Sequence, residues 1–444
     1  MRIVIAGAGE VGGHLAKLLS AEEQDIILVD EDAERLARMD ANFNLMTVNG
    51  SPTSFAVLRQ AHVDKADLFI AVMPSEDSNI VACSIAKNLG ALYTVARINS
   101  YDFIDPVNAG HVRQIGVDRL IYPELLAAEE IVTALTHSWA RHWFELHGGE
   151  LILAGVRLEH GAPMEGVPLK DFAYSHHNFH VSAIKRHHET IIPRGDDIMR
   201  AGDTLYITTT RAHIHDLIEL TGKTEHKIRR ITVIGGGKIT IRLLNLAAER
   251  FDITVIDSDL EACKRLPARG PECEIIHGDG RDAELLAETG IMEADAFVAL
   301  TPSSETNILA CMTAKELGVS KTIAEVENLQ FISQAESLNI GTVINKKLLA
   351  TSAIFQFLLD RDSSTDKCLA MSDAEVAEIE ARPGSKITSA PVKDLKLSRN
   401  LTLAGLFRDG QGMLITGGTQ IRPGDHVLVF CLAGALNKVE KMFV

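Results

Sequence analysis

Short apolar runs alternate along the first hundred residues with segments in which apolar residues recur three and four positions apart. The second spacing predicts helix, and it is clear at Val11, Leu15 and Leu18. The apolar runs are continuous and of strand length, which is typical of strands buried on both faces, and they lie at residues 2–6, 26–29, 68–72 and 93–97. This alternation predicts an α/β domain built on a doubly wound parallel sheet.

The same pattern occurs twice in the chain. Residues 2–104 align with residues 230–332, so that Gly7 falls on Gly235 and Asn79 on Asn307, each 228 positions later. Asp30 falls on Asp257, one position short of this offset. A period of this length is too long for a solenoid and indicates duplication of a larger unit.

A smaller pattern follows each copy, at about residues 150–208 and 374–431. Both segments show short strand patterns around Gly-Asp and Pro-Gly turns, with one short helix at most. Helical stretches at residues 124–143 and 346–359 connect the larger and smaller patterns. We therefore predict two Rossmann-like domains, each followed by a small α+β domain, with boundaries at residues 1–140, 141–225, 226–362 and 363–444.

Composition narrows the function. Of 444 residues, 60 are acidic and 44 basic, a net charge of −16, which opposes binding to nucleic acid or to anionic lipid. No apolar run reaches the ~18 residues of a membrane-spanning helix. The six cysteines are scattered, which is typical of reduced thiols. We expect a soluble cytoplasmic protein that binds no nucleic acid.

A glycine-rich motif follows the first strand and opens the first helix; it reads Gly7-Ala8-Gly9-Glu10-Val11-Gly12. In dinucleotide-binding folds the first glycine permits a tight turn, the second lets main-chain amides approach a pyrophosphate, and the third allows close packing of helix on strand. Asp30 ends the second strand about 20 residues later, where a carboxylate accepts both ribose hydroxyls and repels a 2′-phosphate. The motif predicts an NAD(H) site; a glycine turn with a capping aspartate is the structural alternative.

The second copy departs from this fingerprint; it reads Gly235-Gly236-Gly237-Lys238-Ile239-Thr240. Thr240 replaces the third glycine, and we expect its β-branched side chain to crowd the contact between helix and strand. Lys238 replaces Glu10 and adds positive charge at the start of the helix, while Asp257 still ends the second strand. We predict either an altered nucleotide site or a structural relic.

Further candidate residues follow the later strands of each copy, where adenine and phosphates bind in doubly wound folds. They are Ser51, Met73 and Pro74 in the first copy, and Asp279 and Thr301 in the second. Arg97 ends the fifth strand with a cation that can reach a phosphate, whereas Glu325 takes the equivalent place. The two copies are therefore expected to treat anions differently.

Together these features resemble the TrkA family of potassium-uptake regulatory subunits, in which two RCK (KTN) nucleotide-binding domains are each followed by a TrkA-C domain. The resemblance covers essentially the whole chain and rests on both glycine motifs, the paired segments VMPSEDSN and LTPSSETN, and the Gly-Asp endings of the small modules. It implies a first nucleotide site formed by residues 7–12, Asp30, Met73, Pro74 and Arg97. The implied second site comprises residues 235–239, Asp257, Asp279 and Thr301.

The resemblance also implies an assembly. Such subunits form homotetrameric rings beneath a membrane-embedded potassium transporter subunit (TrkH/TrkG-like), on the inner face of the plasma membrane. Binding of NAD(H), and of ATP or ADP, then reshapes the ring and gates transport. A nucleotide has this effect only when its affinity differs between the two ring states.

Two other functions remain open from the sequence. The glycine fingerprint is shared with NAD-dependent oxidoreductases, although the ~80–90 residues after each copy are few for a substrate domain with an acid–base group. A regulator of another cation channel or antiporter fits equally well, because the membrane partner is not in this chain. We expect a non-enzymatic regulator.

Two clusters of rings complete the sequence features. Trp139 and Trp143 lie four residues apart, which predicts one face of a connecting helix that packs either in a core or against a neighbouring subunit. Five histidines crowd one stretch of the first small module: His176, His177, His180, His187 and His188. His177 and His180 have a spacing that suits metal ligands, and a pH sensor is a further alternative. No cysteine or strong carboxylate partner pattern accompanies them, so we favour a solvated hairpin over a metal site.

Overall fold

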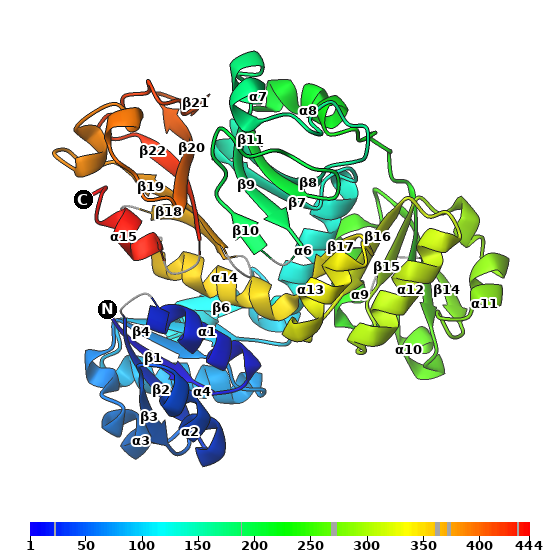
Figure 1. The fold of residues 1–444 in the computed structure, drawn as a ribbon. Coiled ribbons are helices and arrows are strands. Elements are labelled where there is room, and N and C mark those ends of the chain that lie inside the picture. The colour runs from blue at the N-terminus through cyan, green and yellow to red at the C-terminus, as the bar shows by residue number, and fades with distance from the viewer. Residues whose placement is uncertain (22–23, 188, 268–272, 360–364, 371–373, 433–434) are drawn as a thin grey trace. The chain divides into compact units, whose positions relative to one another are not determined.

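The computed structural model describes residues 1–21, 24–187, 189–267, 273–359, 365–370, 374–432 and 435–444. The chain forms two compact units. The first comprises residues 1–123, 347–371 and 433–441, and the second comprises residues 124–346, 372–432 and 442–444. Each unit is built around a six-stranded parallel sheet (Figure 1).

The parallel sheet of the first unit has the strand order β3-β2-β1-β4-β5-β6, the order of a classical dinucleotide-binding fold. Its strands are β1 (Arg2–Ala6), β2 (Asp25–Asp30), β3 (Met46–Asn49), β4 (Leu68–Ala71), β5 (Tyr93–Arg97) and β6 (Arg119–Ile121). The helices between them are α1 (Glu10–Ala21), α2 (Ala33–Asn42), α3 (Phe55–Gln60), α4 (Glu76–Leu89) and α5 (Ala109–Gln114). The predicted doubly wound sheet is therefore confirmed.

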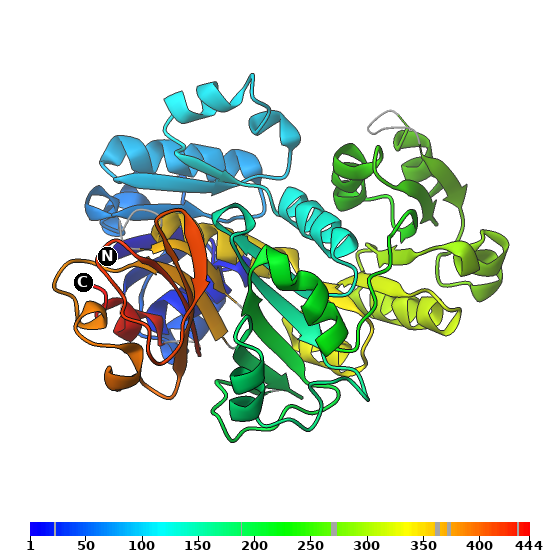
Figure 2. The same cartoon turned by 90° about the horizontal axis from the view of Figure 1, so that it is seen from above.

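The second unit contains the repeat of this sheet, in the equivalent order β14-β13-β12-β15-β16-β17. Its strands are β12 (Arg230–Ile234), β13 (Asp252–Asp257), β14 (Glu274–His277), β15 (Ala296–Ala299), β16 (Lys321–Glu325) and β17 (Thr342–Ile344). Its helices are α9 (Lys238–Ala247), α10 (Leu260–Arg265), α11 (Ala283–Glu288), α12 (Ser304–Glu316) and α13 (Leu329–Ser337). Figure 2 shows helices packed along the strands of both parallel sheets.

The second unit also holds two small antiparallel sheets. The first has the order β10-β9-β11-β8-β7 and the second includes β19-β22-β20-β21, in the equivalent arrangement. The strands are β7 (His142–Leu146), β8 (Leu151–Arg157), β9 (His180–Arg186), β10 (Glu189–Ile191), β11 (Thr204–Thr209), β19 (Ala374–Glu380), β20 (Leu401–Arg408), β21 (Gln411–Leu414) and β22 (His426–Leu432). Helices α7 (Leu169–Ser175) and α8 (Ile214–Leu220) accompany the first sheet. Strand β18 (Thr365–Ala370) and helix α15 (Leu436–Glu440) belong to the first unit.

The Gly-Asp turns that end each small module support a buried ion pair. The guanidinium of Arg186 donates to both carboxylate oxygens of Asp203, at 2.8 and 2.7 Å, and Arg408 does the same to Asp425. Both aspartates are almost fully buried. The bidentate geometry satisfies each carboxylate, so each of the two modules contains the same kind of internal ion pair.

The connecting stretch at residues 124–143 differs from the sequence prediction. Helix α6 (Pro123–Thr136) ends earlier, and Trp143 lies on strand β7 rather than on a helical face. The aromatic-rich run that begins at His142 favours a pleated strand, where it pairs with β8. Trp139 and Trp143 meet edge-to-face at 5.8 Å in the buried core of the first small module, so of the two predicted packings the core is the correct one.

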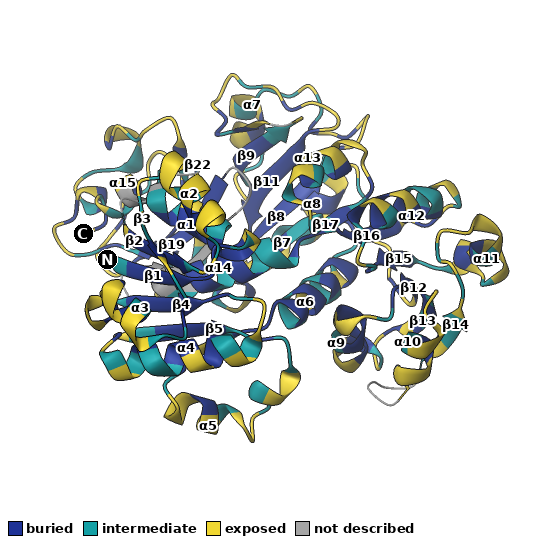
Figure 3. Cartoon of the chain, turned by 90° about the horizontal axis from the view of Figure 1, so that it is seen from below, coloured by how far each residue is buried: buried dark blue, intermediate teal, exposed yellow. Residues whose placement is uncertain are grey.

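Burial follows the layers of the fold. The strands of the sheets are largely buried, and the exposed residues concentrate on the outer faces of the helices and in the loops (Figure 3). Phe69 and Phe297, at matching positions of β4 and β15, are fully buried. The described helices include none that is long and apolar enough to span a membrane.

Candidate functional site

The first glycine motif forms the loop between β1 and α1, and its three glycines meet different constraints. Gly7 has a φ of 108°, a left-handed value that favours glycine, and its amide donates to Val29. A Cβ atom on Gly12 would lie 1.8 Å from the carbonyl oxygen of Gly7, so the third glycine is required for packing. A Cβ atom on Gly9 would meet nothing within 4 Å. The loop therefore leaves open space only beside the glycine that approaches a pyrophosphate in dinucleotide sites.

Asp30 ties this loop to the second strand. One carboxylate oxygen accepts the amide of Ala8 at 2.5 Å, and the other accepts the amide of Asp32 at 2.8 Å. The carboxylate is thereby fixed at the end of β2, beside the start of α1. A carboxylate oxygen can accept more than one hydrogen bond, so this position suits hydroxyl donors from a ribose.

The remaining candidates of the first copy gather at the same edge of the sheet, because the carboxyl ends of parallel strands share one edge. Ser51 follows β3, where its hydroxyl pairs with Thr53, and Pro74 follows β4. Val11 and Ala8 are buried, so at these two positions only the main chain is available to a ligand. Glu10 forms an ion pair with Lys347, near the start of helix α14 (Lys346–Leu359).

Asn79 is a residue whose role the sequence did not indicate. It is fully buried on α4, accepts the amide of Met73 and donates to the carbonyls of Met73 and Arg97. The only sequence signal was its exact match to Asn307 in the repeat. Asn307 makes the same bonds to Thr301 and to the carbonyl of Glu325. This asparagine fixes the loop after the fourth strand in both copies.

Arg97 ends β5 with an unsatisfied group. Its side-chain Nε is buried and has no hydrogen-bond partner among the residues that the structure describes. A buried donor without a partner costs roughly 1–3 kcal/mol, which an anionic ligand would recover. A role for Arg97 as a phosphate ligand stays a prediction.

The second copy has a cavity of about 280 Å³ at the equivalent edge of its sheet. It is lined by residues that include four predicted site residues and two neighbouring polar ones: Gly235, Asp257, Asp279, Thr301, Arg281 and Ser303. Asp257 accepts the amides of Gly236 and Asp259, as Asp30 does in the first copy. A Cβ atom on Gly237, as on Gly9, would meet nothing within 4 Å. The second loop thus retains the open position of the first.

The wall of this cavity carries a fixed ion pair. The guanidinium of Arg281 holds Asp279 through bonds of 3.0 and 2.6 Å, and these hydrogen bonds lower the pKa of that carboxyl. Asp279 remains an acceptor because carboxylate oxygens have several lone pairs. The second site therefore presents a guanidinium and two carboxylates.

Thr240 does not produce the crowding expected from the sequence. Its side chain is fully buried, and its hydroxyl donates to the carbonyl of Gly235. Gly235 is the counterpart of Gly7, whose carbonyl oxygen a Cβ atom on Gly12 would strike in the first copy. The β-branched residue is accommodated because the group that would clash becomes a hydrogen-bond partner. Lys238 begins α9, and Ile239 is buried behind it.

Glu325 ends β16 as predicted but has its own counter-charge. It is buried, which raises the pKa of its carboxyl, and Lys346 lies 3.2 Å away and opposes this rise. Lys346 also pairs with Glu327. Glu325 is absent from the lining of the second cavity, so its carboxylate is not one of the groups that this cavity presents.

Another cavity of about 280 Å³ in the second unit was not predicted from the sequence. It is lined mainly by polar and basic residues from separated segments, among them Arg141, Arg157, Lys185, Arg200, Asp203 and Glu336. Burial, followed by the nearby charge of Arg157, lowers the pKa of Arg141 to about 10. This cavity could not be found from spacing because its cations come from four different stretches of the chain.

The histidine cluster does not assemble into a metal site among the described residues. His177 is exposed, whereas His180 lies on β9 with its Nε2 3.0 Å from the hydroxyl of Thr402. His176 contacts the carbonyl of Phe172, and His187 lies in the turn after β9. His188 lies outside the described residues.

Comparison with known proteins supplies the family. A model described as the TrkA-N domain matches residues 3–123 and again residues 231–346, and a TrkA-C domain model matches residues 153–222 and 376–444. The chain belongs to the TrkA family. Its two parallel sheets thus lie in TrkA-N domains, and the small antiparallel sheets fall largely in its TrkA-C segments, with β7 preceding the first of them.

Relatives of this family match over the full length of the chain. The Trk system potassium uptake protein TrkA of Halomonas elongata is 29% identical over 451 residues, covering 100% of this chain and 98% of that protein. A TrkA homologue of Archaeoglobus fulgidus is also 29% identical, with both chains covered completely. Members of this family are regulatory subunits, so membership places the chain among non-enzymatic regulators. It therefore argues against the oxidoreductase alternative.

Solved structures share the fold of this TrkA-family chain. The crystal structure of the GsuK RCK domain has a TM-score of 0.59 at 16% identity, covering 99% of this chain and 94% of that one. The structure titled GsuK channel bound to NAD has a TM-score of 0.58 at 15% identity, covering 100% and 78%. At these identities the likeness shows the fold alone.

Proposed function

We propose that this chain is the nucleotide-binding regulatory subunit of a Trk-type potassium uptake system and that its first glycine loop holds NAD(H). The observation that carries the proposal is the open space beside Gly9, in a loop whose neighbouring amide, that of Ala8, is held by the carboxylate of Asp30. Full-length similarity to proteins named for Trk potassium uptake supports the physiological role.

Each part of a dinucleotide has a matching group in the first site. The pyrophosphate would lie over Gly9, at the amino terminus of α1, where main-chain amides and the helix dipole favour an anion. The adenosine ribose would bind Asp30, which disfavours a 2′-phosphate and so selects NAD(H) over NADP(H). Arg97 would supply a cation to the phosphates, through the guanidinium whose Nε now has no described partner.

The second site differs in chemistry, and we assign it to ATP or ADP. Its open glycine, Gly237, is followed by Lys238 at the helix start, where the first copy has an acidic residue. A lysine at this place adds an attraction for the higher charge of a terminal phosphate. Arg281, in the cavity wall, is a second cation within the same site.

We further propose that the chain acts as a homotetrameric ring on the cytoplasmic face of the plasma membrane, bound to a membrane-embedded potassium transporter subunit (TrkH/TrkG-like). The net charge of −16 opposes direct adsorption to anionic lipid, which favours attachment through a protein partner. Nucleotides would act by binding the transporting and resting forms of the ring with different affinities. A partner of another cation channel type is less well supported, since the full-length relatives reported above are named for Trk systems.

The nucleotide assignment is tested with a pair of matched variants. Gly9→Ala and Gly237→Ala each add one methyl group to a position that is open in the folded protein and that has no left-handed φ. Neither variant is expected to change the melting temperature. Calorimetric titration with NADH, NADPH, ATP and ADP should show that Gly9→Ala loses NADH binding while Gly237→Ala keeps it. The reverse pattern is expected for ADP.

Two results would overturn this proposal. One is wild-type NADH affinity in Gly9→Ala, and the other is turnover of bound NADH on addition of small-molecule substrates, followed by nicotinamide absorbance. The transport role is tested by potassium uptake in a bacterial host that has the membrane subunit but lacks its regulatory subunit. The wild-type chain should restore potassium uptake, and Gly9→Ala should change the dependence of that uptake on NADH. Failure of the wild-type chain to restore uptake would contradict the assignment.

A further inference from the structure

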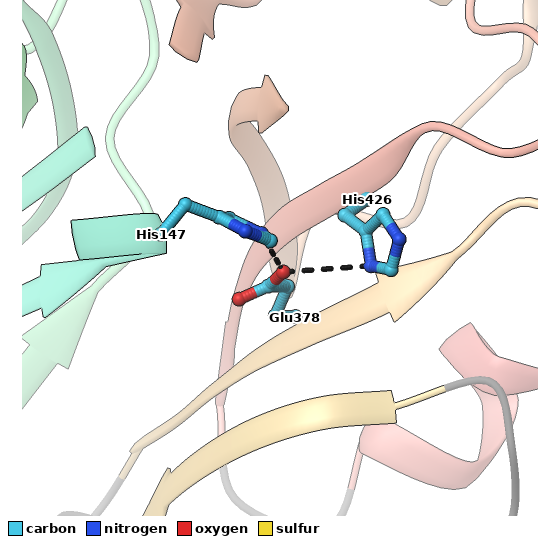
Figure 4. A group of neighbouring side chains, drawn as sticks. All are labelled: His147, Glu378 and His426. Atoms are coloured by element: carbon cyan, nitrogen blue, oxygen red, sulfur yellow. Dashed lines mark hydrogen bonds and ion pairs between the residues drawn. The ribbon is translucent and has the colours of Figure 1, made fainter. Parts of the chain in front are cut away.

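Three side chains from distant parts of the sequence meet in the second unit (Figure 4). His147 lies in the turn after β7, Glu378 on β19 and His426 on β22. Their potential ligand atoms all lie within 4.8 Å of one another. Figure 4 shows both imidazoles directed at the same carboxylate, and one oxygen of Glu378 contacts Nε2 of His147 and lies 3.5 Å from Nδ1 of His426.

The carboxylate at the centre of this group is buried. The side chain of Glu378 is only 3% exposed, and its second oxygen has no hydrogen-bond partner within the described part of the chain. The ion pairs described for Glu378 involve the two imidazoles and no lysine or arginine. A buried carboxylate without a permanent counter-charge is costly, so the site favours an added cation.

The ligand types define which cation fits. Two imidazole nitrogens and one carboxylate oxygen suit zinc and its neighbours among the divalent transition metals, whereas magnesium and calcium prefer oxygen ligands alone. Ligands about 2.0–2.1 Å from a tetrahedral zinc are about 3.3 Å apart, so side-chain adjustments of about 1 Å from the present positions would complete the site. Three protein ligands also leave a fourth position open to water.

The surroundings of His147 hold its ring in place. The ring of Phe407, on β20, stacks on it at 3.8 Å with the planes 1° apart. His147 also has a φ of 47°, an unfavourable backbone value for a residue other than glycine that persists where the surrounding structure requires it. An aromatic neighbour and a constrained backbone orient a ligand in the way that outer contacts do in known metal sites.

We propose that His147, Glu378 and His426 form a site for a divalent transition metal of the zinc class. His147 lies just before the first TrkA-C segment, which begins at residue 153, and the other two ligands lie in the second TrkA-C segment. A bound ion would therefore cross-link the two copies and stabilise their pairing in proportion to its free concentration. This inference does not depend on nucleotide binding by either glycine loop.

Cobalt is a suitable probe because it replaces zinc and reports its coordination by visible absorbance. The full-length protein, stripped with a chelator and dialysed, is titrated with Co²⁺ alone and then back-titrated with Zn²⁺. We expect one equivalent per chain, an absorbance typical of four-coordinate cobalt, and displacement by zinc. A raised melting temperature in the presence of zinc is the second readout.

Three single variants and two controls locate the site. His147→Gln, Glu378→Gln and His426→Gln should each weaken Co²⁺ binding by more than the about 10–100-fold that loss of an outer contact costs. His177→Gln and His215→Gln, which alter exposed histidines, should bind cobalt as the wild type does. Far-ultraviolet circular dichroism identifies any variant that fails to fold, and His426→Gln is the mildest change because that side chain is 28% exposed.

The proposal fails if the wild-type protein takes up no stoichiometric Co²⁺ at micromolar concentration. It fails equally if folded His147→Gln and His426→Gln bind Co²⁺ with wild-type affinity, or if His177→Gln abolishes binding and so places the ion at the surface histidines. Unchanged NADH affinity in the three ligand variants is expected, and it separates failure here from failure of the nucleotide site.

Discussion

The side-chain amide of Asn79 donates to the main-chain carbonyl of Arg97 at 2.8 Å and so joins the loop after β4 to the end of β5. The same side chain also exchanges hydrogen bonds with the main chain of Met73. Because Asn79 is fully buried on α4, these bonds are shielded from water, and they fix the edge of the sheet at which the first glycine loop lies.

Replacing Asn79 by alanine removes these bonds and leaves buried main-chain groups unsatisfied. At about 1–3 kcal/mol for each buried group left without a partner, we expect a local loss of roughly 3 kcal/mol. Hydrogen exchange followed by mass spectrometry should show faster exchange after β4 and at the end of β5. Asn307→Ala is the matched change in the second copy and should affect only its own sheet. Unaltered exchange in Asn79→Ala would contradict the bridging role.

Substitutions at Gly12 and at its counterpart Thr240 are expected to affect NADH binding differently. Gly12→Ala would place a methyl group 1.8 Å from the carbonyl oxygen of Gly7, which forces α1 away from β1. We expect a lower melting temperature together with loss of NADH binding. Thr240→Gly removes one buried hydrogen bond and adds a flexible residue to a helix, a cost of about 1–2 kcal/mol without effect on NADH. Equal stability of Gly12→Ala and wild type would refute the packing argument.

The carboxylate of Asp30 is predicted to control the choice between nucleotides. Asp30→Asn keeps the size of the side chain but removes the charge, so hydrogen bonds to the ribose weaken and repulsion of a 2′-phosphate disappears. We expect NADH affinity to fall about tenfold, the size of one charged hydrogen bond, and the preference for NADH over NADPH to narrow. Competitive calorimetry measures both constants. Asp257→Asn serves as the control, and an unchanged preference in Asp30→Asn would exclude Asp30 from the ribose site.

Lys321 gives the second unit a specific dependence on pH. Its side chain is buried and donates to Ala140 at 2.8 Å, and burial, aided by the charges of Arg141 and Lys223, lowers its pKa to about 7 from an ordinary 10.5. Between pH 7 and pH 10.5 the side chain of Lys321 is therefore protonated in the unfolded chain but neutral in the folded protein. The free energy of unfolding should therefore rise with pH in this window, by up to about 1.4 kcal/mol per unit from this residue.

Two variants isolate that contribution. Lys321→Met has no proton to lose, and Lys321→Arg stays charged throughout the window, so both should lack the rise that wild type shows. Urea denaturation at pH 7.5 and 9.5 measures it, with the difference between variant and wild type as the quantity compared. If the difference for both variants is the same at the two pH values, Lys321 does not titrate in the folded protein.

The parts of the fold that follow local rules were predictable from the sequence. Continuous apolar runs identify strands buried on both faces, and the spacing of Gly7, Gly9 and Gly12 identifies the strand–loop–helix unit. The repeat then extends the same conclusion to the second copy. Helix α6 was overextended because the apolar spacing from Trp139 to Trp143 fits a helical face, whereas the aromatic run from His142 forms a strand by pairing with β8.

The parts that depend on tertiary packing were not predictable. The sequence predicted that Thr240 crowds the contact between helix and strand, because it does not show that the threonine hydroxyl donates to the carbonyl of Gly235. The sequence also does not show that the carboxylate of Glu325 lies 3.2 Å from the ammonium of Lys346. The group of His147, Glu378 and His426 follows no spacing rule, because its members are brought together only by the pairing of separate sheets.

The contrast between Arg97 and Glu325 has a consequence for how the duplicated halves operate. In the second half the carboxylate of Glu325, at the end of the fifth strand, lies 3.2 Å from the ammonium of Lys346 in the same chain. In the first half no hydrogen-bond partner is described for the buried Nε of Arg97, so a counter-charge at this position would have to come from a bound anion. Under the proposed function, the two halves would therefore respond differently to an anionic ligand, because a cation stands at this position in the first half and a carboxylate in the second.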